Sequence, residues 1–118
     1  YREALADLDG FERVWLLFHL HQAKPWKPKV LPYRDTVERG LFATRAPSRP
    51  AAIGMSVVKL ISIDGNELHV EGVDILDGTP LLDIKPYVPE FDAFPDSKAG
   101  WLDKDQRTGN VADDRFTR

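Results

Sequence analysis

The sequence predicts an all-β fold, mainly antiparallel, arranged as a small β-barrel with short helical and irregular excursions. Short apolar stretches recur at close spacing, and turn sequences such as Asp64-Gly65-Asn66 separate them. Strands do not alternate with long helices, and no strand is followed by G-x-G-x-x-G. A dinucleotide-binding βαβ fold is therefore not expected.

The strand predictions rest on hydrophobic pattern and turn chemistry. Residues 12–21 (ERVWLLFHLH) have no polar helical face, which predicts a strand covered on both sides. Apolar Leu68 and Val70 alternate with Glu67 and His69, which is typical of a half-buried antiparallel strand. The further expected strands cover residues 41–45, 54–63, 67–75 and 81–87.

The flanking segments are expected to be short helices or loops. The sequence predicts a short helix over residues 2–8, with Gly10 as the residue that stops it. Residues 22–40 predict a loop, because their three prolines do not fit a helix or a central strand. We expect one helical turn near Trp101 in a polar segment that frays at its end.

Two domain-level expectations follow. A barrel domain is expected over residues 1–94 and a C-terminal surface arm over residues 95–118. The chain starts at Tyr1 in sequence typical of the middle of a domain, so we expect the barrel's N-terminal strand to be missing from it.

Charge is distributed unevenly along the chain. The net charge is −3, which argues against a protein that coats nucleic acid. The segment from Lys24 to Arg49 nevertheless holds seven Lys or Arg residues against Asp35 and Glu38, whereas the segment from Pro50 onward holds seven basic and thirteen acidic residues. A local anionic ligand explains this asymmetry better than a generally adhesive surface.

Composition excludes several classes of protein. The chain has no cysteine, so disulfides and thiolate metal sites are excluded, and a reducing compartment suits it. No apolar run approaches the roughly 18 residues of a membrane-spanning helix. We therefore expect a cytoplasmic protein that does not cross a membrane.

Three groups of residues could carry chemistry. Arg45 and Arg49 offer planar donors that suit carboxylates and phosphates, with Gly54 allowing a close backbone approach, although surface ion pairs would explain them equally well. His19 and His21 share one strand face, where they could bind a polar ligand or simply pack. A metal site would need further ligands, so none is assigned.

The third group is acidic and lies in residues 72–87. Asp74, Asp77 and Asp83 stand near Lys85 and Tyr87, and such carboxylates can do acid–base work or simply form turns. No Ser-His-Asp elbow, phosphate-binding loop or zinc signature is present. The residues alone therefore indicate a barrel with a polar region rich in Arg, His and Asp.

Three segments in order are similar to one known family. FERVWLLFHLHQ (11–22), RGLFATRAPSRPAAIGMSVVKL (39–60) and VEGVDILDGTPLLDIKPYVP (70–89) resemble the TsaA/TrmO-like family. Its members are tRNA adenine N6-methyltransferases that use S-adenosylmethionine on a small β-barrel. The resemblance covers roughly Leu8 to Phe94 and implies the same cofactor and activity here.

The resemblance also implies a donor site. His21 and Gln22 match the family's donor-contacting pair, Arg45 matches the arginine of its FATR motif, and Met55 matches a donor-lining position. The turn that wraps the cofactor corresponds to residues 74–80. The implied cofactor-binding residues are thus His21, Gln22, Arg45, Met55, Asp74, Leu76, Asp77, Gly78, Thr79 and Pro80. A homodimer is implied, with the donor site near its interface.

The implied acceptor is the adenosine next to the anticodon in the tRNA anticodon loop, carrying threonylcarbamoyl. Trp26 and Tyr33 could stack bases, or could pack the loop onto the barrel. The catalytic candidates are Asp74, Asp77, Asp83 and Tyr87, of which the three aspartates could hold the accepting amine. The candidates to bind substrate are Arg49, Lys27, Lys29 and Arg34.

Two departures from the family leave alternatives open. The family has Asn-Pro where this chain has Ala51-Ala52, and its N-terminal strand and Pro-Arg-Gln donor contact are not found here. A methyltransferase acting on another RNA or a small molecule, or a β-barrel that only binds nucleic acid, would also fit the residues. The last is disfavoured by the acidic net charge and the scattered aromatic residues.

Overall fold

The computed structural model describes residues 1–106, with side chains described through Asp103. The chain divides into two compact units, Tyr1–Val88 and Pro89–Arg118. The expected domain over residues 1–94 and arm over 95–118 stay a prediction. None of the described helices has the length and hydrophobicity that crossing a bilayer requires.

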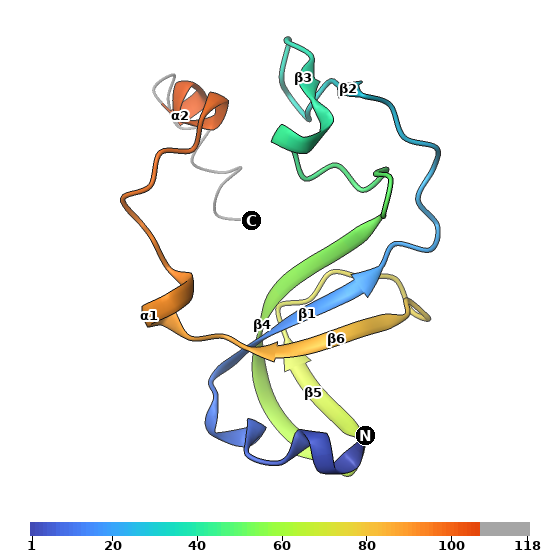
Figure 1. Cartoon of the computed structure of the whole chain (residues 1–118), viewed down its shortest axis with the longest axis vertical. Coiled ribbons are helices and arrows are strands. Elements are labelled where there is room, and N and C mark those ends of the chain that lie inside the picture. Colours follow the sequence, from blue (N-terminus) through green and yellow to red (C-terminus); the bar gives the residue numbers. More distant parts are fainter. Residues whose placement is uncertain (107–118) are drawn as a thin grey trace. The chain divides into compact units, whose positions relative to one another are not determined.

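A four-stranded sheet forms the centre of the first unit (Figure 1). Its strands are β1 (Arg13–His19), β4 (Ile53–Asp64), β5 (Glu67–Glu71) and β6 (Leu81–Pro86), in the order β5-β4-β1-β6. Every pairing is antiparallel, which confirms the predicted all-β, mainly antiparallel class.

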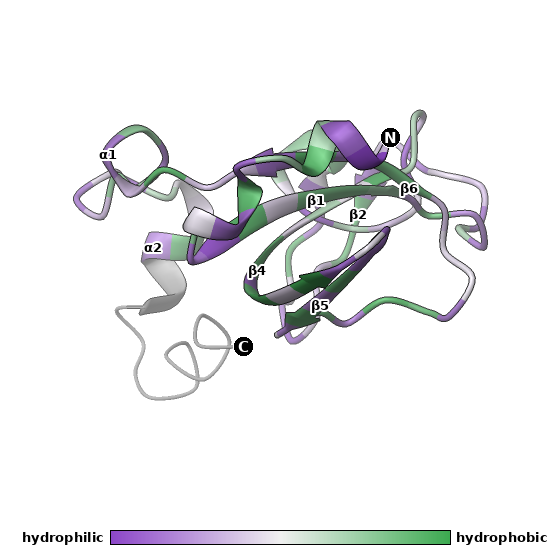
Figure 2. Ribbon diagram, turned by 90° about the horizontal axis from the view of Figure 1, so that it is seen from below, coloured by the Kyte–Doolittle hydropathy of each residue, from purple (hydrophilic) through white to green (hydrophobic). Residues whose placement is uncertain are grey.

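The sheet is bent at two places where the register shifts. One shift lies between Leu60 and Ser62, where β4 pairs with β5, and the other lies between Leu17 and Phe18, where β1 pairs with β6. Such bulges increase twist and bend a strand. The curved course of β4 is visible in Figure 2, which also shows hydrophobic residues concentrated on the paired strands.

The core lies against one face of β1. Val14, Leu16, Phe18 and Val58 are buried and pack with Leu8, Leu20, Leu60, Val70, Val73 and Ile84. On the opposite face, Trp15 and Leu17 are only half-buried. The prediction that this strand is covered on both sides is therefore correct for the face of Val14, Leu16 and Phe18. The face of Trp15 and Leu17 is covered only in part by the residues that the structure describes.

Several predicted boundaries are wrong for local reasons. Residues 41–43 form a 3₁₀ turn, η3 (Leu41–Ala43), rather than a strand, because the Thr44 N–H and hydroxyl both donate to the Leu41 carbonyl, at 3.0 and 2.8 Å. β5 ends at Glu71, since Gly72 has a φ of +91° that leaves the strand region.

The N-terminal helix prediction is also corrected. The segment contains two 3₁₀ turns, η1 (Arg2–Leu5) and η2 (Leu8–Gly10). Asp7 lies between them with a φ of +66°, and this left-handed residue interrupts any continuous helix.

The proline-containing segment predicted as a loop includes a small hairpin. β2 (Lys29–Val30) pairs antiparallel with β3 (Arg39–Gly40). Asp35 holds the connection: one carboxylate oxygen accepts from the Thr36 and Val37 N–H groups at 2.7 and 3.2 Å, and the other accepts from Arg39 Nε at 3.2 Å. Burial favours a higher pKa for Asp35, but these hydrogen bonds and the positive charge of Arg39 outweigh it and lower the pKa below 3.8.

The second unit contains two short helices, α1 (Pro89–Asp92) and α2 (Trp101–Gln106). The Ala99 N–H donates to the Asp103 carboxylate at 2.7 Å just before α2, which satisfies one N–H near the start of the helix. The predicted helical turn near Trp101 is confirmed. The predicted frayed end lies outside the described residues.

Gly54 lies opposite Phe18 in the β1–β4 pairing, and the Phe18 ring rests against its backbone. A Cβ at Gly54 would overlap the ring, with Cζ and Cδ2 at 2.8 and 2.9 Å. The prediction that Gly54 admits a ligand is therefore wrong, because the ring of Phe18 fills that space.

We expect Gly54→Ala to destabilise the protein by about 1–3 kcal/mol, the usual cost of overpacking a core. Urea unfolding measures the loss, and Gly40→Ala is the matched control because no atom lies within 4 Å of a Cβ there. Equal stability of Gly54→Ala and wild type would contradict the packing of Phe18 on Gly54.

The lowered pKa of Asp35 makes the β2–β3 connection sensitive to acid. Because the pKa is lower in the folded state, the stabilisation is present above pH 3.8 and is lost as the pH falls through the folded-state pKa. At pH 7, Asp35→Asn should speed hydrogen exchange at the Val37 amide, and the difference from wild type should shrink below pH 3.8. Glu38→Gln removes a neighbouring charge and should leave this exchange unchanged. If the exchange rates of Asp35→Asn and wild type still differed at low pH, the lowered pKa of Asp35 would not explain the stabilisation of this connection.

Candidate functional site

A cavity of about 340 Å³ opens at one end of the sheet in the first unit. Three segments form its wall: Leu20–Lys24 after β1, Pro47–Ser48 before β4, and Asp74–Leu76 with Thr79 before β6. Phe18 lines the cavity as well. The lining is mainly apolar, with a few polar side chains, as in most small-molecule sites.

Strand pairing brings these segments together. β1 is antiparallel to both β4 and β6, so the end of β1 lies beside the beginnings of its two neighbours. The Leu20 N–H donates to the Ala52 carbonyl at 2.8 Å, and the His19 N–H donates to the Pro80 carbonyl at 2.9 Å. These bonds hold the three connecting segments at one edge of the sheet.

The cavity collects part of the predicted donor site. His21, Gln22, Asp74, Leu76 and Thr79 line it. Thr79 also closes the preceding turn, since its hydroxyl donates to the Leu76 carbonyl at 2.6 Å.

The other predicted donor residues lie elsewhere. Gly78 has a φ of +85°, so it shapes the same turn without lining the cavity, and neither Asp77 nor Pro80 lines it. Met55 pairs with Leu17, and this register puts it on the sheet face opposite Phe18. The donor-binding roles of these residues stay predictions.

Arg49 and Arg45 have different surroundings. Arg49 Nη1 donates to the carbonyls of Thr44 and Ala46 at 2.8 and 3.1 Å, and its guanidinium lies 5.7 Å from the centre of the Phe42 ring. Arg49 therefore organises its own loop. Arg45 is exposed, and its side chain makes no hydrogen bond or ion pair with any residue that the structure describes.

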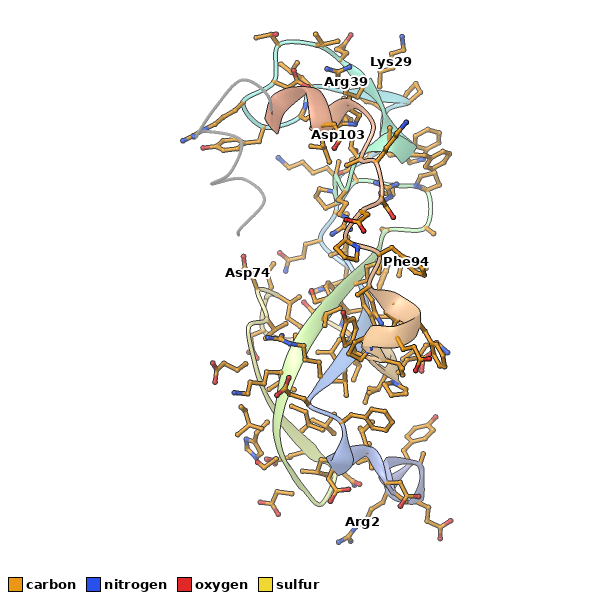
Figure 3. The ribbon with its side chains drawn as sticks, turned by 90° about the vertical axis from the view of Figure 1, so that its left-hand side faces the viewer. Arg2, Lys29, Arg39, Asp74, Phe94 and Asp103 are labelled. Carbon is orange, nitrogen blue, oxygen red and sulfur yellow. The ribbon has the colours of Figure 1, made fainter. Side chains whose placement is uncertain are left out.

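The other predicted substrate-binding cations lie in residues 27–34. The guanidinium of Arg34 lies 5.3 Å from the centre of the Tyr33 ring. Figure 3 shows Lys29 and Arg39 together at the end of the unit away from Arg2. Lys27, Lys29, Arg34 and Arg45 do not line the cavity.

Among the candidates to hold an accepting amine, only Asp74 lines the cavity. Asp83 is exposed on β6, where its carboxylate accepts from the Ile84 N–H at 2.8 Å and pairs with Lys85 at 3.4 Å. The ring of Tyr87 packs against Trp15, with ring centres 5.9 Å apart. Asp77 is exposed on the turn beyond the cavity.

Several lining residues were not singled out from the sequence, among them Leu20, Lys24 and Ser48. Lys24 adds a basic residue to the wall, and its position two residues after Gln22 is a signal in the sequence that could have identified it. Among the described side chains, no group of three or more His, Asp or Glu residues lies close enough to hold a metal ion.

A second, smaller hollow of about 240 Å³ lies between the N-terminal turns and β6. Residues 4–8, Phe11, Ile84 and Pro86 line it. Asp7 is its one ionisable lining side chain, whereas the larger cavity is lined by His21, Lys24 and Asp74.

Comparison with known proteins gives close relatives. The family described as tRNA-methyltransferase O N-terminal domain matches residues 1–93. A protein of Pyrococcus abyssi, named a probable S-adenosyl-L-methionine-binding protein, is 52% identical over 104 residues, 88% of this chain and 56% of that protein. The tRNA (adenine(37)-N6)-methyltransferase of Mus musculus is 43% identical over 93 residues, 76% of this chain and 22% of that protein.

A solved structure supports the same grouping. The crystal structure of TrmO from Pseudomonas aeruginosa has a TM-score of 0.68 and 47% identity, over 83% of this chain and 41% of that chain. The chain thus spans about half the length of the Pyrococcus protein and less of the other two. The resemblance to the TsaA/TrmO-like family is confirmed: the chain belongs to the tRNA-methyltransferase O N-terminal domain family.

Proposed function

We propose that this chain binds S-adenosylmethionine in the 340 Å³ cavity and transfers its methyl group to N6 of the threonylcarbamoyl-adenosine next to the anticodon in tRNA. One observation carries the proposal. The strand pairing brings His21 and Gln22 together with Asp74, Leu76 and Thr79 around one cavity, and the family resemblance assigns these residues to the methyl donor.

The cavity wall suits the chemistry of this donor. Phe18, Leu20 and Ile75 offer apolar surface for an adenine ring, while His21 and Gln22 offer hydrogen-bonding groups. Lys24 in the wall and exposed Arg45 can each pair with the carboxylate of a methionine moiety. The donor supplies an electrophilic methyl group on a sulfonium.

The residues of the chain would then act mainly by positioning. The adenine nitrogen attacks the methyl carbon, the carbon–sulfur bond breaks with its electron pair passing to sulfur, and the nitrogen loses a proton. Asp74 is the carboxylate of the cavity wall, so we assign it to hold the amine N–H and to accept that proton.

The proposed partners and setting follow from the same relatives. The Mus musculus relative is named for activity on adenine 37 of tRNA, and the basic residues between Lys24 and Arg49 suit a phosphate backbone. Exposed Ile53, Met55 and Ile61 along β4 offer apolar surface for a homodimer. We further propose a cytoplasmic location.

A second candidate is the same chemistry on another acceptor. Ala52 has a φ of +47°, whereas the proline that the family carries at this position is restricted to a φ near −65°. The loop before β4 therefore follows a path here that the family sequence does not permit. Because this loop differs from that of the family, the alternative that we keep is a methyltransferase with an acceptor other than the tRNA adenosine.

The test combines donor binding with product analysis. Calorimetry should show binding of S-adenosylmethionine, and labelled methyl groups should pass to tRNA purified from a strain that lacks the modification. Donor binding without transfer to any RNA would favour the alternative acceptor. The absence of donor binding would contradict both enzyme proposals.

Arg45→Ala should weaken donor binding by about 10- to 150-fold, the range expected for losing a charge-assisted hydrogen bond, and Arg45→Lys should restore part of it. Arg13→Ala removes an exposed arginine from the opposite end of β1 and should leave affinity unchanged. Unchanged affinity in Arg45→Ala would assign the carboxylate contact to another cation such as Lys24.

A further inference from the structure

Phe42 is an aromatic side chain that a hydrogen-bonded 3₁₀ turn holds in solvent. It is 79% exposed, although its neighbour Leu41 is 3% exposed and anchors the same 3₁₀ turn. The Leu41 N–H donates to the Pro28 carbonyl at 2.9 Å, and Thr44 returns two hydrogen bonds to the Leu41 carbonyl. The exposure of the ring is thus built into the fold of the segment.

Arg49 supports the ring from within its own loop. Its guanidinium lies 5.7 Å from the ring centre, within the range of a cation–π interaction, and is itself fixed by the carbonyls of Thr44 and Ala46. The arginine therefore acts as a backing for the ring, which leaves most of Phe42 open to a flat partner.

The ring belongs to the segment that forms part of the cavity wall. Residues 41–49 are tied together by the hydrogen bonds of Thr44 and Arg49. Phe42 stands at one end of this segment, and Pro47 and Ser48 line the cavity near the other end. A partner stacked on the ring would be held by the same loop that borders the proposed donor site.

The charge of the surroundings indicates what that partner is. The segment from Lys24 to Arg49 holds seven basic residues against two acidic ones, and Asp35 of the acidic pair is already bound to Arg39. An exposed aromatic ring in a positively charged setting is the combination by which proteins hold unpaired bases of a nucleic acid.

We infer that Phe42, backed by Arg49, is the platform on which an unpaired base of the acceptor RNA stacks. The inference rests on the proposed function, because it assumes an RNA acceptor at this site. On this inference Arg49 acts as a positioning residue: it holds the Phe42 ring and the loop carbonyls in place and does not itself contact a phosphate of the RNA.

The test measures binding of a fluorescent tRNA anticodon stem-loop to the full chain, with donor affinity measured in parallel. Phe42→Ala should weaken RNA binding by roughly 5- to 150-fold, the range for one base–aromatic stack. Phe42→Trp should keep wild-type affinity, and Phe42→Leu should be as weak as alanine. The salt dependence of binding should not change, because no phosphate contact is lost.

Controls separate this inference from the proposed function. Phe91→Ala removes a similarly exposed aromatic ring from the second unit and should bind RNA like wild type. Donor affinity should be unchanged in Phe42→Ala, and thermal unfolding should show an intact fold.

Each contrary result has a distinct meaning. If wild type binds neither donor nor stem-loop, the proposed function fails and the platform with it. If wild type binds both and Phe42→Ala does too, or if Phe42→Leu binds fully, only the platform is overturned. Loss of a dimer in Phe42→Ala, seen by sedimentation, would also overturn it, because the ring would then serve a protein interface.

Discussion

The antiparallel pairing of β1 with both β4 and β6 is the constraint on which the rest of the structure depends. It places the end of β1 beside the beginnings of its neighbours, and hydrogen bonds from His19 and Leu20 extend this alignment beyond the strand. Segments far apart in the sequence thereby share one cavity. The packing of Phe18 on Gly54 stabilises the same edge, since the ring contributes both to the core and to the cavity wall.

The two arginines of the loop before β4 differ in their surroundings. Arg49 uses its guanidinium to tie Thr44, Ala46 and Phe42 together, whereas Arg45 stays exposed. One arginine orders the loop, and the other is available to an anion.

Much of the fold could be predicted from the sequence, because period-two patterns and the Asp64-Gly65-Asn66 turn are local signals. The 3₁₀ turn at Leu41–Ala43 could not, since the Thr44 hydroxyl and backbone N–H both donate to the Leu41 carbonyl and override a β-like composition. The family resemblance assigned His21, Gln22 and Asp74 to one donor site, and these three residues line one cavity. It could not show that Met55 faces away from Phe18, because that depends on strand register.

The proposed function depends above all on the cavity at the end of β1 as the binding site of the methyl donor. Amide chemical shifts recorded by NMR during a titration with S-adenosylmethionine test it most directly. If the donor binds in this cavity, the largest shifts will fall in residues 20–24, at Ser48 and in residues 74–79. Shifts concentrated instead in residues 4–11 and at Ile84, around the smaller hollow, would contradict it.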